Sequence, residues 1–172
     1  MKVLASTSFI GTTGFANHAQ SFLTSLDKLT PIKVRNSTIG NSWKGHSLTS
    51  HDKEPYITDQ MKDMLILQTL KSNEGRIDKP LYNHDPLYTP DINLVLAEHN
   101  NHYFYNEYQG YKIAYNVWET DQYDPQFLNQ LSKFNELWVP SEWQKQISID
   151  QGYPSDRIFV IPEGVDGIQF KP

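Results

Sequence analysis

The sequence predicts an α/β protein, built on a Rossmann-like, open and mostly parallel β-sheet with helices on both faces. Three observations lead to this prediction. Short apolar runs of strand length recur along the chain, amphipathic stretches of helix length alternate with them, and turn-forming residues separate the two. Strand, helix and strand in succession make βαβ units, which give parallel sheets with right-handed crossovers.

Length and composition limit the classes of protein. A chain of 172 residues suits one domain with a core of its own. The formal net charge of -5 argues against nucleic-acid binding, which needs a basic surface. The absence of cysteine excludes disulfides, a thiolate nucleophile and a zinc–thiolate site. The first residues resemble neither a signal peptide nor a transmembrane segment, so we expect a cytoplasmic protein.

The first βαβ unit fills the first forty residues. We expect a strand over residues 2–9, a loop over 10–14, and a second strand over 32–39. Between them lies a helix that ends at Pro31. Apolar residues recur on one face of this helix at spacings of three and four, namely Phe15, Ala19, Phe22, Leu23, Leu26 and Leu29.

The middle of the chain is less regular. Residues 41–56 and 75–90 are rich in polar residues or proline and predict loops, and a helix capped by Thr58 or Asp59 runs between them to Lys71. Strands are expected over residues 91–97 and 112–117. Asp124 as N-cap and Pro125 as first residue then start a helix, whose inward residues are Phe127, Leu128, Leu131 and Phe134.

The last βαβ unit has the clearest boundaries. Residues 137–139 form a short apolar strand, and Ser141 with Gln144 three residues later makes a capping box for the next helix. Gly152 ends that helix, and residues 157–161 form the last strand.

Ligands of open parallel sheets bind at the carboxyl ends of the strands, near the switch in strand order. This rule selects four loops, at residues 11–14, 98–102, 118–121 and 141–142. In the first, Gly11, Thr12, Thr13 and Gly14 precede a helix, where free N–H groups favour an anion or a sugar hydroxyl. Alternatively the glycines only make the turn. The G-x-x-G spacing lacks the dinucleotide fingerprint G-x-G-x-x-G.

The loop WETD, from Trp118 through Glu119 and Thr120 to Asp121, combines aromatic and acidic residues. The Glu119 carboxylate could accept hydrogen bonds from sugar hydroxyls while Trp118 stacks on a pyranose. Alternatively, Trp118 belongs to the core and Glu119 caps the next helix. We interpret Trp138 and Trp143 as core and packing residues.

Glu98 and His99 follow a strand, and His102 stands three residues after His99. Together they could bind a metal ion, but such spacings are common by chance, so we predict no metal site and no cofactor.

The C-terminal run ELWVPSEWQKQ…GYPSDRIFVIPEGVDGIQFKP, from Glu136 onward, resembles the end of the N-terminal domain in the retaining, sugar-nucleotide-dependent glycosyltransferases of family 4, or group 1, which have the GT-B fold. The resemblance is strong over roughly the last third of the chain. Glu163 stands where asparagine is commonest in that family. The matching anchors are Arg157, Ile158, Val160, Ile161, Pro162, Gly164, Val165, Asp166, Phe170 and Pro172.

The resemblance implies one half of a GT-B fold, with an acceptor-side domain over residues 1–162. Residues 163–172 would then begin a missing donor-binding domain, with Glu163, Gly164, Val165 and Asp166 as the hinge. His99 and Glu119 would be catalytic. Residues 11–14, Glu98, Trp118, Thr120 and Asp121 would contact the donor or the acceptor.

The resemblance also implies the substrates. The complete enzyme would transfer a sugar, with retention, from a nucleotide-sugar donor to a hydroxyl of a saccharide, lipid-linked or protein acceptor. Most donor-binding residues, including a Glu-x7-Glu motif, would lie in the second domain, so the chain alone is expected to be inactive. Two alternatives remain: a non-catalytic saccharide- or partner-binding module of the same fold, and a nucleotide-binding domain for a nicotinamide or flavin cofactor, against which the missing fingerprint argues.

Overall fold

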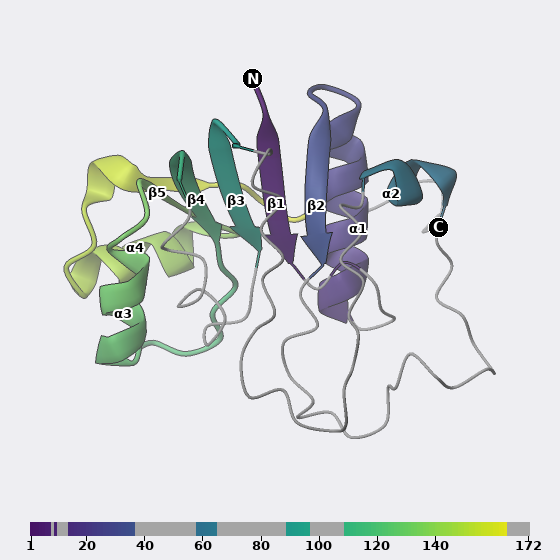
Figure 1. Ribbon diagram of the computed structural model, residues 1–172. Helices are drawn as coiled ribbons and strands as arrows, with labels where there is room; N and C mark the ends of the chain where they lie inside the picture. Colours follow the sequence, from purple (N-terminus) through teal and green to yellow (C-terminus); the bar gives the residue numbers. More distant parts are fainter. Residues whose placement is uncertain (8, 10–13, 37–57, 65–88, 97–108, 165–172) are drawn as a thin grey trace, which may run out of the picture.

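The computed structural model describes residues 1–7, 9, 14–36, 58–64, 89–96 and 109–164. Strands and helices alternate through most of this part, as Figure 1 shows. In chain order, the elements are β1 (Val3–Thr7), α1 (Gly14–Asp27), β2 (Ile32–Asn36), α2 (Asp59–Met64), β3 (Ile92–Leu96), β4 (Tyr111–Tyr115), α3 (Pro125–Leu131), β5 (Glu136–Val139), α4 (Glu142–Asp150), a 3-10 turn (Ser155–Arg157) and β6 (Ile158–Val160).

The six strands form one sheet in the order β2-β1-β3-β4-β5-β6, and every neighbouring pair is parallel. The predicted Rossmann-like α/β fold is therefore confirmed. The strand order reverses at β1, because β2 lies on one side of it and β3 on the other. This reversal places the switch point between the carboxyl ends of β1 and β3.

Helices cover both faces of the sheet. On one face, Ala19 and Leu23 of α1 pack in a cluster with Ala5, Leu94 and other alternate strand residues. On the other face, Phe127 and Leu131 of α3 and Ile147 of α4 pack in a second cluster with Val95 and Leu137. Successive residues of β3 divide between the two clusters, as the two-residue period of a strand requires.

Helix α1 has the predicted buried face but is shorter than predicted. It ends at Asp27, whose Oδ1 accepts a hydrogen bond from the Ile32 N–H at 2.9 Å and so fixes the turn into β2. Leu29 falls in this turn and is 84% exposed, so its assignment to the apolar face was wrong.

The caps of α3 and α4 follow the sequence prediction in part. Asp124 Oδ1 accepts the Gln126 N–H, and Ser141 Oγ accepts the Gln144 N–H at 3.2 Å. Gly152 ends α4 with a φ of 95°, in the region that glycine favours. The second half of the capping box is absent, because the Gln144 side chain turns into the core and bonds elsewhere.

Trp143 is 53% exposed, so its interpretation as a core residue was wrong. The buried residues of α4 are Gln144, Ile147 and Ser148, which leaves Trp143 beside the buried face. Trp138 packs against the first cluster, as expected. Helix α2 is the first part of the helix predicted to run to Lys71. The remainder of that prediction, residues 65–71, lies outside the described residues, as do the predicted loop over 41–56 and residues 75–88 of the loop predicted over 75–90. Within the described part, none of the helices has the length and apolar character needed to cross a membrane.

Candidate functional site at the carboxyl edge of the sheet

The predicted site residues divide between described and undescribed parts of the chain. Gly14 starts α1, residues 118–121 follow β4, Glu142 follows β5, and Glu163 and Gly164 follow β6. Because all strands are parallel, these segments share the carboxyl edge of the sheet. Outside the described residues lie Gly11, Thr12, Thr13, Glu98, His99, His102, Val165 and Asp166.

The Trp118 ring is partly buried and packs against the second cluster. It stacks on Phe127 with ring centroids 5.2 Å apart and lies 4.9 Å from Tyr123, while its Nε1–H donates to the Gln122 carbonyl at 3.0 Å. This arrangement matches the packing alternative for Trp118. A sugar-stacking role for its ring stays a prediction.

Glu119, Thr120 and Asp121 are exposed at the tip of the same loop. Thr120 Oγ1 donates to the Gln122 carbonyl at 2.9 Å, which tightens the tip. The Glu119 carboxylate therefore projects from a short, internally bonded loop, where it could accept hydrogen bonds from a ligand.

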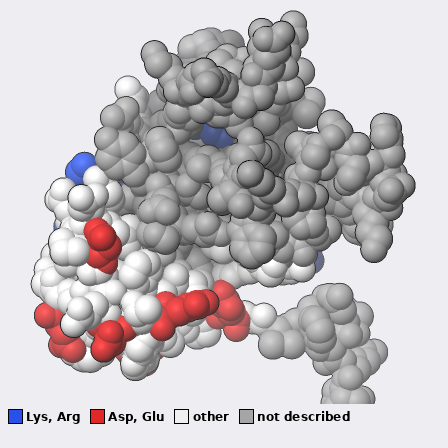
Figure 2. Space-filling view, turned by 90° about the horizontal axis from the view of Figure 1, so that it is seen from below, with Lys and Arg blue, Asp and Glu red and all other residues white. Residues whose placement is uncertain are grey.

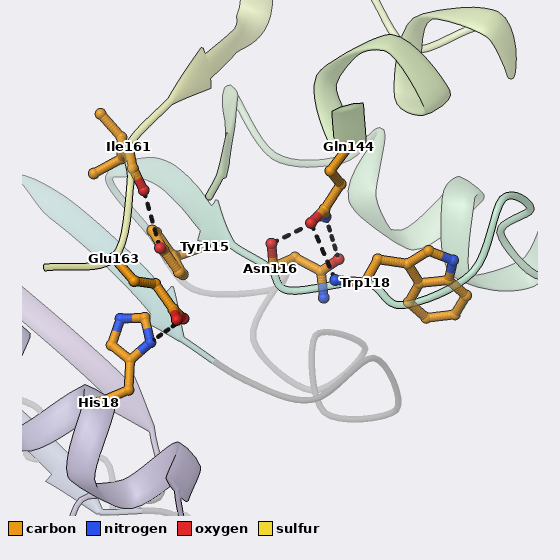
Figure 3. A network of polar contacts seen from close by, with 7 residues as sticks. All are labelled: His18, Tyr115, Asn116, Trp118, Gln144, Ile161 and Glu163. Carbon is orange, nitrogen blue, oxygen red and sulfur yellow. Dashed lines mark hydrogen bonds and ion pairs between the residues drawn. The ribbon is translucent and has the colours of Figure 1, made fainter. Parts of the chain in front are cut away.

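A buried glutamine holds the start of this loop. Gln144 of α4 is 1% exposed, and its Oε1 accepts the Trp118 N–H at 3.0 Å. Its Nε2 lies 3.0 Å from the Asn116 carbonyl and 3.2 Å from Asn116 Oδ1, as Figure 3 shows. The same Nε2 lies 3.0 Å from the Tyr123 hydroxyl. These buried hydrogen bonds stabilise the observed arrangement of the start of the loop.

A second glutamine holds the end of the loop. Gln151, seven residues after Gln144, accepts the Tyr123 N–H at 2.7 Å and donates to the Asp121 carbonyl at 3.3 Å. Seven residues make nearly two helical turns, so both glutamines lie on one face of α4. Helix α4 therefore fixes the loop that carries Glu119 at both ends.

The segment after β6 crosses the carboxyl edge of the sheet. The Ile161 N–H donates to the Val139 carbonyl at 2.8 Å, and the Tyr115 hydroxyl donates to the Ile161 carbonyl at 3.0 Å. Glu163 Oε1 then lies 2.6 Å from His18 Nδ1 on α1. The segment thus passes from β6 past β5 and β4 to α1, a path visible in Figures 1 and 3.

His18 also contacts aromatic rings. It meets Tyr115 edge-on with centroids 5.1 Å apart, and Phe22 at 6.0 Å. Burial raises the pKa of the Tyr115 hydroxyl, and the nearby Glu163 carboxylate raises it further. Tyr115 therefore stays neutral and remains a donor to Ile161. Burial also raises the pKa of Tyr123, although its hydrogen bonds to Ser148 and Gln144 lower it.

The described loops after β4, β5 and β6 are acidic. Residues 116–124, 140–142 and 161–164 include no lysine or arginine, and they expose the carboxylates of Glu119, Asp121, Asp124, Glu142 and Glu163. Figure 2 looks onto the carboxyl edge, and acidic side chains line the lower margin of the described part. A cationic or neutral ligand suits these loops better than an anion.

The described residues include no cluster of three or more histidine or acidic side chains arranged to hold a metal ion. An open pocket of about 320 Å³ lies at the opposite edge, at the amino ends of β1 and β2, where Lys2, Asp27, Lys33 and Asp63 line it with four other residues. None of the predicted site residues that the structure describes lines this pocket.

Sequence reasoning missed three residues of the carboxyl edge: His18, Gln144 and Gln151. The seven-residue spacing of the two glutamines was a usable signal, since it places both side chains on the same side as the buried residues Ile147 and Ser148. His18 carried no comparable signal, because its partner Glu163 lies far along the chain.

No family model matches this chain, and neither a curated protein nor a solved structure is similar enough to match it. The α/β fold is therefore established by the coordinates alone, and the function has to be argued from the residues of the carboxyl edge.

Proposed function

We propose that this chain is the acceptor-side domain of a two-domain, nucleotide-sugar-dependent glycosyltransferase. One observation carries the proposal. The segment after β6 runs along the carboxyl edge of the sheet and is bonded there to β5, β4 and α1. The loop of Glu119 leaves the sheet at the same edge, after β4. A chain that continued from Gly164 would leave the domain at the edge where ligands of parallel sheets bind.

This path supports a protein of two domains that contact different parts of the substrates. A second domain attached at this edge would face the Glu119 loop and would enclose a substrate between the two. The acidic loops described above lack cations for a donor diphosphate, so in this proposal the second domain supplies the groups that stabilise the leaving diphosphate.

In the proposed reaction, Glu119 orients or deprotonates the acceptor hydroxyl. It is exposed, and the two glutamines of α4 hold its loop in place. A positioned carboxylate contributes typically about 10²- to 10⁴-fold in such a role. His99 is the second proposed catalytic residue and lies outside the described part.

A second candidate is a non-catalytic saccharide-binding module. The acidic character of the described loops favours it, because carboxylates accept hydrogen bonds from hydroxyls without any need for a nucleotide. The two candidates differ in whether nucleotide-sugar is consumed.

The test uses the full protein as its gene encodes it. It is incubated with UDP-, GDP-, ADP- and dTDP-sugars and an acceptor mixture, and release of the nucleoside diphosphate is measured. We expect release with one donor, and a loss of about 10²-fold or more in Glu119→Ala and His99→Ala. Asp156→Ala is the matched control, since Asp156 is exposed in the 3-10 turn before β6, at the opposite edge.

If no donor is consumed while saccharides bind, the module is the correct function. If a donor is consumed but both substitutions leave turnover unchanged, the assignment of the catalytic residues is wrong.

A further inference from the structure

A buried amide at the carboxyl end of β4 has a donor without an acceptor. Asn116 directly follows β4, and its side chain is 1% exposed. Within the described part of the chain, its Nδ2 has no hydrogen-bond partner. Leaving a buried amide donor unpaired lowers stability, so such a group in a folded protein calls for an explanation.

The orientation of this amide follows from its neighbours. The backbone N–H of Trp118 can only donate, so the Gln144 atom that faces it must be the oxygen Oε1. Gln144 Nε2 is then a donor, and the Asn116 atom 3.2 Å from it must be the acceptor Oδ1. Asn116 Nδ2 is therefore directed away from Gln144, as Figure 3 shows.

The rest of the network leaves no room for a different arrangement. The Tyr123 hydroxyl accepts from Gln144 Nε2 and lies 3.0 Å from Ser148 Oγ, which in turn donates to the Gln144 carbonyl at 2.8 Å. Each of these groups already has a partner. Turning the Asn116 amide would bring its NH₂ group against that of Gln144 and would still leave Asn116 Nδ2 without an acceptor there.

The surroundings limit the ligand that could satisfy Nδ2. The loop that begins at Asn116 carries Glu119 and Asp121, both exposed, and residues 116–124 include no lysine or arginine. A phosphate or carboxylate would meet repulsion here, whereas a sugar hydroxyl can accept from an amide and donate to a carboxylate.

We propose that Asn116 binds a neutral saccharide, with Nδ2 donating a hydrogen bond to a hydroxyl or ring oxygen. Gln144 is the positioning residue that keeps this donor turned outward. Because Nδ2 is covered, a ligand oxygen reaches it through a local opening of this edge, and the bond is then shielded from water. The choice of a saccharide rests on the proposed function.

The test follows the side-chain amide signals of Asn116 by ¹H–¹⁵N NMR in the 172-residue chain. The neutral probes are methyl α-D-glucopyranoside, methyl α-D-mannopyranoside and methyl β-D-galactopyranoside, and the anionic probes are glucose 1-phosphate and UDP. We expect a neutral glycoside to shift the Asn116 signals and the anions to leave them unchanged.

Three variants locate the effect. Asn116→Asp removes the donor and should weaken glycoside binding about tenfold, the loss expected for one hydrogen bond. Gln144→Glu presents acceptor oxygens to Asn116, so its amide should turn inward and binding should fall similarly, even if Asn116→Asp does not fold. Asn129→Asp, an exposed site on α3 with the same change of charge, should bind normally.

The proposal is overturned if no neutral glycoside shifts the Asn116 signals, if the anions shift them instead, or if binding survives Gln144→Glu. These outcomes are separate from the fate of the proposed function. If a glycoside binds but no nucleotide-sugar is consumed, Asn116 is a binding residue of the saccharide-binding module. If nucleotide-sugar is consumed but no glycoside shifts the Asn116 signals, the acceptor binds elsewhere.

Discussion

At the residue scale, Gln144 is the side chain on which the order of the carboxyl edge depends. In Gln144→Ala, the Trp118 N–H and the Asn116 carbonyl lose buried partners. We expect a loss of about 2 to 4 kcal/mol in the free energy of unfolding, measured by urea denaturation. Gln146→Ala is the control, because Gln146 is exposed on the same helix and its side chain bonds the exposed Asp150, so its change should stay within about 0.5 kcal/mol. Equal losses in the two variants would contradict the role given to Gln144.

A buried tyrosine makes stability depend on alkaline pH. Burial raises the pKa of Tyr153 to about 12, although Arg157 opposes the shift. In the unfolded chain tyrosine ionises near pH 10, roughly its ordinary pKa. The stabilising contribution is therefore complete below about pH 10 and is lost as the pH rises towards about 12, at up to about 1.4 kcal/mol per pH unit.

Tyr153→Phe removes this ionisation. The variant should lose less stability than the unmodified chain when urea unfolding at about pH 8 is compared with unfolding at about pH 11. Among the described residues, the Tyr153 hydroxyl makes one long bond, 3.5 Å to the Leu131 carbonyl, so the two proteins should differ little at the lower pH. If the free energy of unfolding falls equally with pH in the variant and in the unmodified chain, Tyr153 does not titrate as described.

At the element scale, the segment 161–164 is anchored by contacts from three separate elements. Tyr115→Phe removes the bond to the Ile161 carbonyl, and Glu163→Gln removes the charge that faces His18. We expect both variants to raise the hydrogen-exchange rate of the Ile161 amide, which bonds the Val139 carbonyl, by about three- to tenfold.

Glu119→Gln serves as the control for that exchange measurement. Glu119 is exposed on the neighbouring loop, and its substitution removes the same charge at the same edge of the sheet. If Glu119→Gln accelerates the Ile161 amide as much as Glu163→Gln does, the effect is one of overall charge and the anchor is not specific.

Most described elements were predictable because local patterns determine them. The runs at residues 91–97 and 112–117 are apolar and bounded by turns, and β3 and β4 lie within two residues of those limits. Asp124 with Pro125 and Ser141 were readable as caps for the same local reason. Leu29 was misassigned because the apolar spacing continues past the point where Asp27 closes the helix.

At the scale of the whole molecule, the sequence predicted which segments share the carboxyl edge better than it predicted the contacts between them. Parallel strands bring their carboxyl ends together whatever the loops contain, so residues 118–121, 142 and 163 were predictable as neighbours. Glu163 lies 145 positions after its partner His18, and Gln144 lies 28 positions after its partner Asn116. Such pairs form only when the chain folds, and a local pattern does not encode them.

The proposed function also makes a prediction about the molecule in its source. A transferase needs groups that bind the donor, and the described loops over residues 116–124, 140–142 and 161–164 include no lysine or arginine for a diphosphate. We therefore expect native mass spectrometry of the protein isolated from its source to find this sequence in a species of roughly twice the mass of one such domain, as one chain or as a complex. Denaturing mass spectrometry of the same sample separates these two forms. A native species with the mass of this domain alone would remove the transferase proposal, and the saccharide-binding module would then account for the acidic edge and the unpaired donor of Asn116.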